Sequence, residues 1–160
     1  EFDFRKRLDF ASALTNFTFQ TNLSYIFNKV NDPKVKINRP MQGQSPYVIN
    51  GSLQYDIGKA GISTTLLFNQ VGRRILYVGN EQVPEIWENA RPLLDFQIAK
   101  KVLNNKGDIR LNISDIFNKR AYFYHDVDKS KNLKLGSTDV IAISRNYGTT
   151  VSISFGYSIK

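Results

Sequence analysis

Apolar and polar side chains alternate with a period of two over most of this chain. In the stretch NFTFQTNLSYIF, residues 16–27, the large apolar side chains share one parity and Thr, Gln, Asn and Ser dominate the other. This period is typical of a β-strand with one apolar and one polar face. The apolar face lies either against a protein core or against lipid, and the alternation is the same in both cases.

Seven stretches show this pattern, and no stretch has a convincing helical period. They cover residues 1–10, 16–31, 47–57, 61–71, 93–101, 108–115 and 150–160. Alternating stretches bounded by turn residues predict an all-β, mostly antiparallel chain.

The connections between the predicted strands alternate between short and long. The short ones are residues 11–15, 58–61 and 104–107, and the long ones are residues 31–45, 75–90 and 119–146. Successive connections of an antiparallel meander lie at opposite ends of the sheet, so one end carries tight turns and the other carries large loops. Outer-membrane barrels show this asymmetry, with short periplasmic turns and long extracellular loops. A soluble β-sandwich rarely sorts its loops in this way.

Strand length and the position of aromatic residues also favour a membrane barrel. The stretch at residues 16–31 is longer than the roughly 9–11 residues that a β-strand needs to cross the hydrocarbon layer. Tyr is favoured at membrane interfaces, because its ring is apolar and its hydroxyl group needs water. The aromatic residues near predicted strand ends are Phe17, Tyr25, Phe27, Tyr47, Tyr55, Tyr147 and Tyr157.

Composition narrows the function classes. The 160 residues suit one domain, the hydrophobic fraction is 41%, and the chain has no cysteine. No stretch approaches the roughly 20 apolar residues of a membrane-spanning helix. The net charge of +8 would suit an anionic surface. However, the basic residues do not gather on one predicted face, and no nucleic-acid-binding motif is present, so we expect no nucleic-acid partner.

Four segments, in order along the chain, resemble the C-terminal barrel segment of TonB-dependent outer-membrane receptors. They are RPMQGQSPYVINGSLQYD (39–56), LLFNQVGRRILYVG (66–79), IWENARPLLDFQIAKK (86–101) and DIRLNISDIFN (108–118). The similarity is strongest to the large nutrient importers, including those that work with a surface lipoprotein. One departure lies at the end of the chain, where Ile159 takes the place of the usual terminal aromatic residue and Lys160 follows.

The resemblance implies a fold, a location and partners. We expect residues 1–160 to supply about seven antiparallel transmembrane strands of a barrel of roughly 22 strands in the outer membrane. The plug domain and the TonB box of such receptors are absent from this chain, and its first residues, EFDFRKRLDF, already alternate. The expected partners are outer-membrane lipid and lipopolysaccharide, the rest of the barrel and its plug, TonB through the missing N-terminal part, and a surface lipoprotein in some members.

Candidate functional residues fall into three groups. Lumen-facing candidates, which contact plug or solute or form a general hydrated wall, are Asp95, Gln97, Arg110, Asn112 and Ser114. Extracellular-loop candidates are Arg73, Arg74, Tyr77 and Trp87. The two arginines either bind lipopolysaccharide phosphates or form a solvated strand end. Trp87 either contacts a ligand or packs within its loop. An apolar row that serves as a C-terminal assembly signal consists of Val151, Ile153, Phe155, Tyr157 and Ile159.

Enzyme chemistry has no support in the sequence. His125 is the only histidine, and the HDVD segment at 125–128 is expected to be solvated rather than to bind metal. No nucleophile triad, phosphate-binding loop or paired-carboxylate motif is present, so we predict no catalytic residue, no metal site and no cofactor. In SDIFN, Asp115 and Asn118 are expected to end the strand and to open the loop.

Three other functions remain open at this point. A barrel of the same family can act as a scaffold in an outer-membrane assembly or secretion complex. The chain can also belong to a smaller barrel that transports nothing, or it can be a soluble β-domain.

Overall fold

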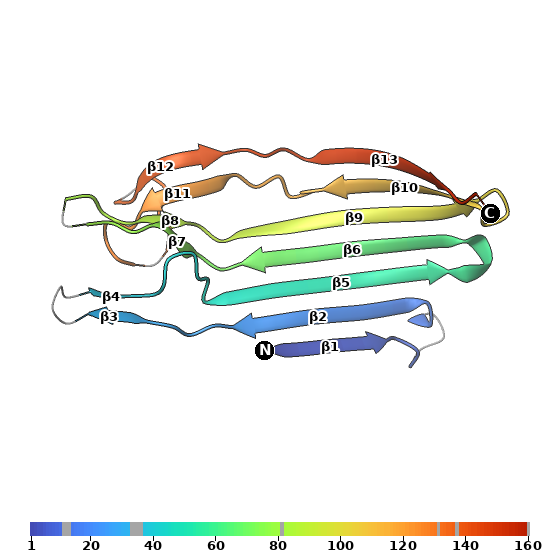
Figure 1. Ribbon diagram of the computed structural model, residues 1–160, viewed down its shortest axis with the longest axis horizontal. Helices are drawn as coiled ribbons and strands as arrows, with labels where there is room; N and C mark the ends of the chain where they lie inside the picture. Colours follow the sequence, from blue (N-terminus) through green and yellow to red (C-terminus); the bar gives the residue numbers. More distant parts are fainter. Residues whose placement is uncertain (11–13, 33–36, 81, 131, 137, 160) are drawn as a thin grey trace.

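The computed structural model describes residues 1–10, 14–32, 37–80, 82–130, 132–136 and 138–159. Seven strands lie side by side in one antiparallel main sheet (Figure 1). In sheet order they are β1 (Phe2–Arg7), β2 (Phe17–Tyr25), β5 (Tyr47–Ile57), β6 (Ile62–Val71), β9 (Arg91–Val102), β10 (Gly107–Ser114) and β13 (Thr150–Tyr157). All seven predicted strands are therefore present, in an open sheet in which β1 and β13 are the edges.

The long connections contain short strands that the sequence pattern did not predict. A loop sheet has the order β12 (Val140–Arg145), β11 (Ala121–His125), β8 (Ile86–Glu88) and β7 (Arg74–Tyr77). A separate hairpin pairs β3 (Val30–Asp32) with β4 (Ile37–Arg39). The predicted strand over residues 16–31 is wrong as one element, because it ends at Tyr25. Ile26 donates to the Pro46 carbonyl, but Pro46 has no N–H to return, so the β2–β5 ladder stops there.

The sorting of connections by length is confirmed. Figure 1 shows the hairpin and the loop sheet at one end of the main sheet and the tight connections at the other. The β5–β6 turn is a short 3₁₀ segment, Gly58–Ala60, closed by Gly61 with φ 62°. This left-handed conformation suits glycine, and a Cβ there would lie 3.1 Å from the Lys101 Cβ. Asp115 and Asn118 end β10 as predicted, both with positive φ.

The register places the two parities on opposite faces of the main sheet. One row across the sheet runs Phe19, Leu53, Leu66, Phe96, Ile113 and Val151 on one face. A second row runs Thr18, Gln54, Thr65, Gln97, Asn112 and Ser152 on the other. Directly opposed residues share a face, so the main sheet has one apolar face and one polar face over the six strands from β2 to β13. On β1, Phe2 and Phe4 continue the apolar face, and Lys6 stands opposite Phe19.

The apolar face has no protein layer over it among the described residues. Ile153 is 75% exposed and Phe155 is 60% exposed. The fully buried apolar side chains lie in the loop sheet instead, with Ile75 and Tyr124 both at 0% exposure. A soluble sandwich or barrel would bury the apolar parity of its strands in a core, and this sheet does not.

Aromatic residues mark both ends of the apolar face. Phe17 and Tyr55 stand opposite each other near the tight turns, with ring centroids 4.5 Å apart. Tyr25 and Tyr47 are opposed at the loop end of the same two strands. An apolar band between two aromatic girdles is the pattern of a transmembrane β-barrel wall. No helix in the described part of the chain is long and apolar enough to cross a membrane.

The C-terminal row forms as predicted within β13. Val151, Ile153, Phe155 and Tyr157 occupy the apolar face opposite the alternate residues of β10, and Ile159 lies just past the strand. The role of this row in assembly stays a prediction.

Leu111→Arg tests the assignment of the faces. Leu111 lies between Ile98 and Ile153 on the apolar face, and an Arg near the bilayer midplane costs about 2–4 kcal/mol. The matched control, Asn112→Arg, changes the neighbouring residue on the polar face and should cost under about 1 kcal/mol. Urea unfolding of the protein in lipid vesicles measures both. Equal costs for the two variants would contradict the assignment.

Candidate functional site: the polar face and the loop sheet

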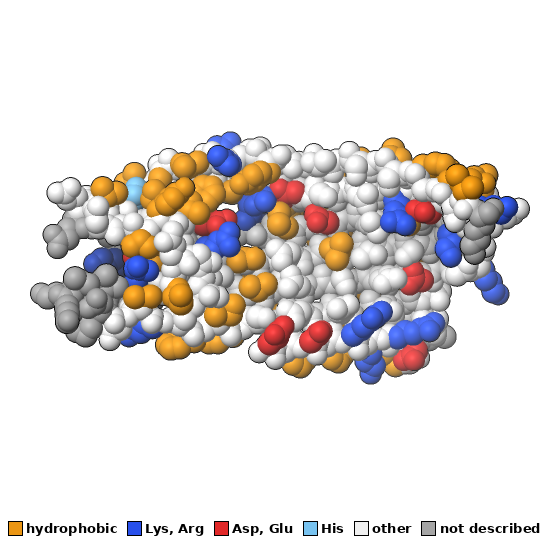
Figure 2. Space-filling model, in the orientation of Figure 1, with side chains coloured by type: hydrophobic (Ala, Val, Ile, Leu, Met, Phe, Trp, Pro, Cys, Tyr) orange, Lys and Arg blue, Asp and Glu red, His pale blue; other side chains and the backbone are white. Residues whose placement is uncertain are grey.

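Hydrogen bonds between side chains link neighbouring strands across the polar face. The Gln97 amide donates to the Asn112 amide oxygen at 2.6 Å, and Asn112 donates to the Ser152 hydroxyl at 3.4 Å. On the neighbouring strands β6 and β5, Asn69 donates to Asn50 at 2.6 Å. Figure 2 shows this face, where polar and charged side chains predominate over the main sheet. The polar face is therefore built to contact water or polar groups.

All five predicted lumen-facing residues lie on this face. Gln97 and Asn112 belong to the ladder above, and Ser114 continues the polar parity of β10. Arg110 binds Asp108 at 2.6 Å in an exposed ion pair. Asp95 accepts the backbone N–H of Asp115 at 2.8 Å, so its role is partly structural.

Asp115 joins the main sheet to the segments that follow it. It is 8% exposed and has φ 55°, a conformation that Asp and Asn tolerate better than most residues. Its carboxylate accepts a hydrogen bond from Arg91 at 2.5 Å, and its carbonyl accepts one from the Thr149 hydroxyl at 2.9 Å. The Arg91 guanidinium also lies 5.0 Å from the Tyr147 ring centroid. One residue thus ties the ends of β9, β10 and β13 together.

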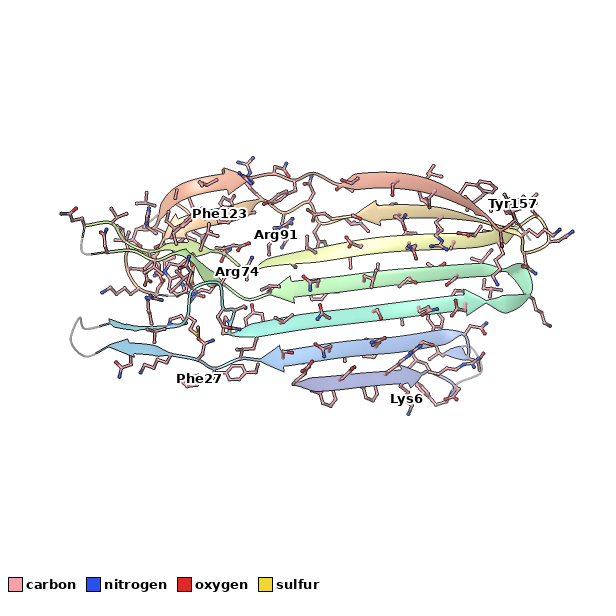
Figure 3. The ribbon with its side chains drawn as sticks, in the orientation of Figure 1. Lys6, Phe27, Arg74, Arg91, Phe123 and Tyr157 are labelled. Carbon is pink, nitrogen blue, oxygen red and sulfur yellow. The ribbon has the colours of Figure 1, made fainter. Side chains whose placement is uncertain are left out.

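A polar cavity of about 190 Å³ lies where the main sheet meets the loop sheet. Its walls come from the loop ends of β6 and β9 and from β7 and β8, and the Arg74 and Arg91 labelled in Figure 3 both line it. The lining residues are Asn69, Val71, Gly72, Arg74, Glu88, Asn89, Arg91 and Leu93. Arg74 donates to Glu88 at 2.7 Å, which leaves further guanidinium donors at the cavity.

Three of the predicted loop candidates, Arg74, Tyr77 and Trp87, belong to strands of the loop sheet, and Arg73 directly precedes β7. Arg73 donates to Asp126 at 2.9 Å and to the Tyr124 hydroxyl at 3.1 Å, and its guanidinium stacks 3.9 Å from the Trp87 ring centroid. Burial raises the pKa of Tyr124, and the adjacent Arg73 opposes that rise. Arg73 is therefore committed to internal contacts, whereas Tyr77 is 58% exposed.

Acidic residues gather beside Arg73. Asp126 follows β11, and one carboxylate oxygen from each of Asp126, Asp128 and Asp139 lies within 4.8 Å of the other two. The Asp126 side chain is only 5% exposed, which differs from the solvated segment expected at residues 125–128. His125 points elsewhere, with Nδ1 3.1 Å from the Glu85 carbonyl oxygen.

Lys134 completes the charge pattern of this cluster. Its ammonium lies 2.5 Å from an Asp128 oxygen, and this hydrogen bond, with those from the Ser130 hydroxyl and backbone, holds the pKa of Asp128 well below its usual range. The same contact raises the pKa of Lys134. Sequence reasoning missed Asp139, which lies 13 residues after Asp126 and immediately before β12. The only signal for Asp139 in the sequence is that a polar residue stands at a strand start, and such residues are too common to identify this one.

Residues 7–157 match the outer membrane protein beta-barrel family. The chain belongs to this family. The match extends from β2 to β13 and so includes six strands of the main sheet and the whole loop sheet, and it agrees with a sheet that has one uncovered apolar face. It supports an outer-membrane β-barrel and leaves the narrower resemblance to TonB-dependent receptors as a hypothesis. Searches of curated proteins and of solved structures find no match.

Asp115→Asn tests the junction at the end of β10. The variant keeps the shape of the side chain and removes the charge that pairs with the part-buried Arg91, so we expect a loss of about 1–3 kcal/mol in the free energy of unfolding. The control, Asp108→Asn, removes an exposed pair and should cost about 0–1 kcal/mol. Denaturant unfolding of the folded barrel provides the measurement. A larger loss for Asp108→Asn would refute the role given to Asp115.

Proposed function

We propose that this chain forms part of the wall of a TonB-dependent outer-membrane transporter that imports a nutrient. The observation that carries this proposal is an open, seven-stranded sheet with one uncovered apolar face and one hydrogen-bonded polar face. A membrane barrel with lipid outside and a hydrated lumen uses both faces.

The two edges of the sheet support a larger barrel. Among the described strands, β1 pairs with β2 alone and β13 pairs with β10 alone. An open edge in hydrocarbon leaves backbone N–H and C=O groups without partners, at several kcal/mol for each group. Further strands of one barrel, which the resemblance to a large receptor implies, would pair with both edges and satisfy these groups.

The cavity at the junction supports a role in solute contact. Asn69 and Arg91 line it from the polar-face parity of β6 and β9, at the end of the sheet that carries the large loops, and Arg74 and Glu88 line it from β7 and β8. A solute that enters from outside passes this end first if the large loops are extracellular. Arg74 and Asn69 offer donors that suit a polar solute with carbonyl, hydroxyl or carboxylate oxygens.

Uptake measurements in the producing bacterium test the proposal. A strain that lacks the gene should lose import of at least one polar nutrient, and a copy whose N-terminal energy-coupling segment is disabled should fail to restore it. The wild-type protein and the disabled copy should reach the outer membrane at equal abundance. Normal import in the deletion strain, together with defective assembly or secretion of other surface proteins, would overturn the transport proposal in favour of a scaffold.

Arg74→Ala tests the part played by the cavity. The variant removes a lining guanidinium, and we expect the half-saturating solute concentration for uptake to rise about tenfold, which corresponds to about 1.4 kcal/mol. Arg110→Ala is the matched control, because Arg110 is also an ion-paired arginine on the polar face but lies outside the cavity lining. Equal uptake by the two variants and the wild type would exclude the cavity as a solute contact.

A further inference from the structure

We propose that Asp126, Asp128 and Asp139 form a binding site for a divalent cation, with Ca²⁺ as the ion that fits best. The site clamps the base of the β11–β12 connection, because Asp126 immediately follows β11 and Asp139 immediately precedes β12. This cation site does not depend on whether the protein imports a nutrient.

The spacing of the carboxylates matches a shared ion. Ca²⁺ binds carboxylate oxygens at about 2.3–2.6 Å, so two ligands of one ion lie at most about 5 Å apart. The three aspartates offer oxygens that all lie within 4.8 Å of one another. Backbone carbonyls and water can supply the remaining ligands, since Ca²⁺ accepts six to eight oxygens in flexible geometry.

The burial of Asp139 is an independent sign of a ligand. This residue is 8% exposed, and its Oδ2 accepts the backbone N–H of Lys134 at 2.8 Å. Its Oδ1 is buried and has no hydrogen-bond partner among the described residues. A buried carboxylate oxygen without a donor is costly, and a cation in the cluster would remove that cost.

The net charge of the cluster also favours a bound cation. Arg73 pairs with Asp126 and Lys134 pairs with Asp128, so two positive groups face three carboxylates. Arg73 is held by Trp87 and Tyr124 and stays in place. The Lys134 side chain is 49% exposed, so its ammonium can swing into solvent when a cation binds Asp128. Lys134 and the cation therefore compete for the same oxygens.

Calorimetric titration of the complete gene product in detergent with CaCl₂ tests the site. We expect binding in the range of extracellular calcium modules, about 10⁻⁴–10⁻³ M, and weaker binding of MgCl₂, because Mg²⁺ demands a smaller octahedral site. Hydrogen–deuterium exchange should show slower exchange in residues 121–145 when Ca²⁺ is added. No heat of binding and unchanged exchange at about 5 mM CaCl₂ would overturn the proposal, and equal affinity for Mg²⁺ would overturn the choice of ion.

Three variants separate a cation site from a purely structural ion cluster. Asp139→Asn should weaken Ca²⁺ binding at least about tenfold by removing a charged ligand. Lys134→Met should strengthen Ca²⁺ binding, because it removes the competing ammonium. Glu85→Gln is the control, since it removes an acidic charge near the loop sheet but outside the cluster, and it should change affinity less than about twofold. Unchanged or weaker binding in Lys134→Met would contradict the competition between the ammonium and the cation, and Ca²⁺ binding that Asp139→Asn leaves unchanged would overturn the site.

Discussion

The whole arrangement depends on an apolar sheet face that the chain itself does not cover. Six neighbouring strands, from β2 to β13, align apolar side chains into a continuous row, and residues such as Ile153 and Phe155 stay exposed on that face. Each such side chain gains about 1.5–3 kcal/mol when it leaves water, so a hydrocarbon layer is what makes the sheet stable. The same layer forbids open edges. One constraint therefore requires both lipid against the apolar face and partners for the strand edges, as in the outer-membrane β-barrels of the family that the chain matches.

The two sheets of the chain differ in where their apolar side chains are buried. The main sheet relies on its surroundings for its apolar face, whereas the loop sheet buries Ile75, Phe123 and Tyr124 in a small core of its own. Arg91 and Asp115 connect the strands near the place where the sheets meet. Figure 3 places Arg74, Arg91 and Phe123 at this end, far from Tyr157 at the turn end. The polar cavity and the acidic cluster both lie on the loop-sheet side, where solutes and ions in water have access.

The strands of the main sheet could be predicted because each is long and has two different faces. Residues 47–57 alternate over the whole of β5, and their boundaries agree with the structure. The loop sheet could not be predicted in this way. β8 has three residues, and β11 buries consecutive side chains such as Phe123 and Tyr124, so neither shows a period of two. The partnership of Arg73 with Asp126 spans 53 residues, and only the tertiary fold brings such groups together.

Site-directed spin labelling along β9 tests directly whether the apolar face of the main sheet lies against lipid. Residues 1–160 contain no cysteine. Once any cysteine elsewhere in the complete protein is replaced by serine, single cysteines at Leu94, Asp95, Phe96, Gln97 and Ile98 can be labelled specifically after reconstitution in vesicles. We predict that labels at 94, 96 and 98 are accessible to oxygen, which concentrates in the bilayer. Labels at 95 and 97 should be accessible to a water-soluble nickel chelate instead. Labels at 94, 96 and 98 that neither reagent reaches would mean that protein covers this face, and the account would be wrong.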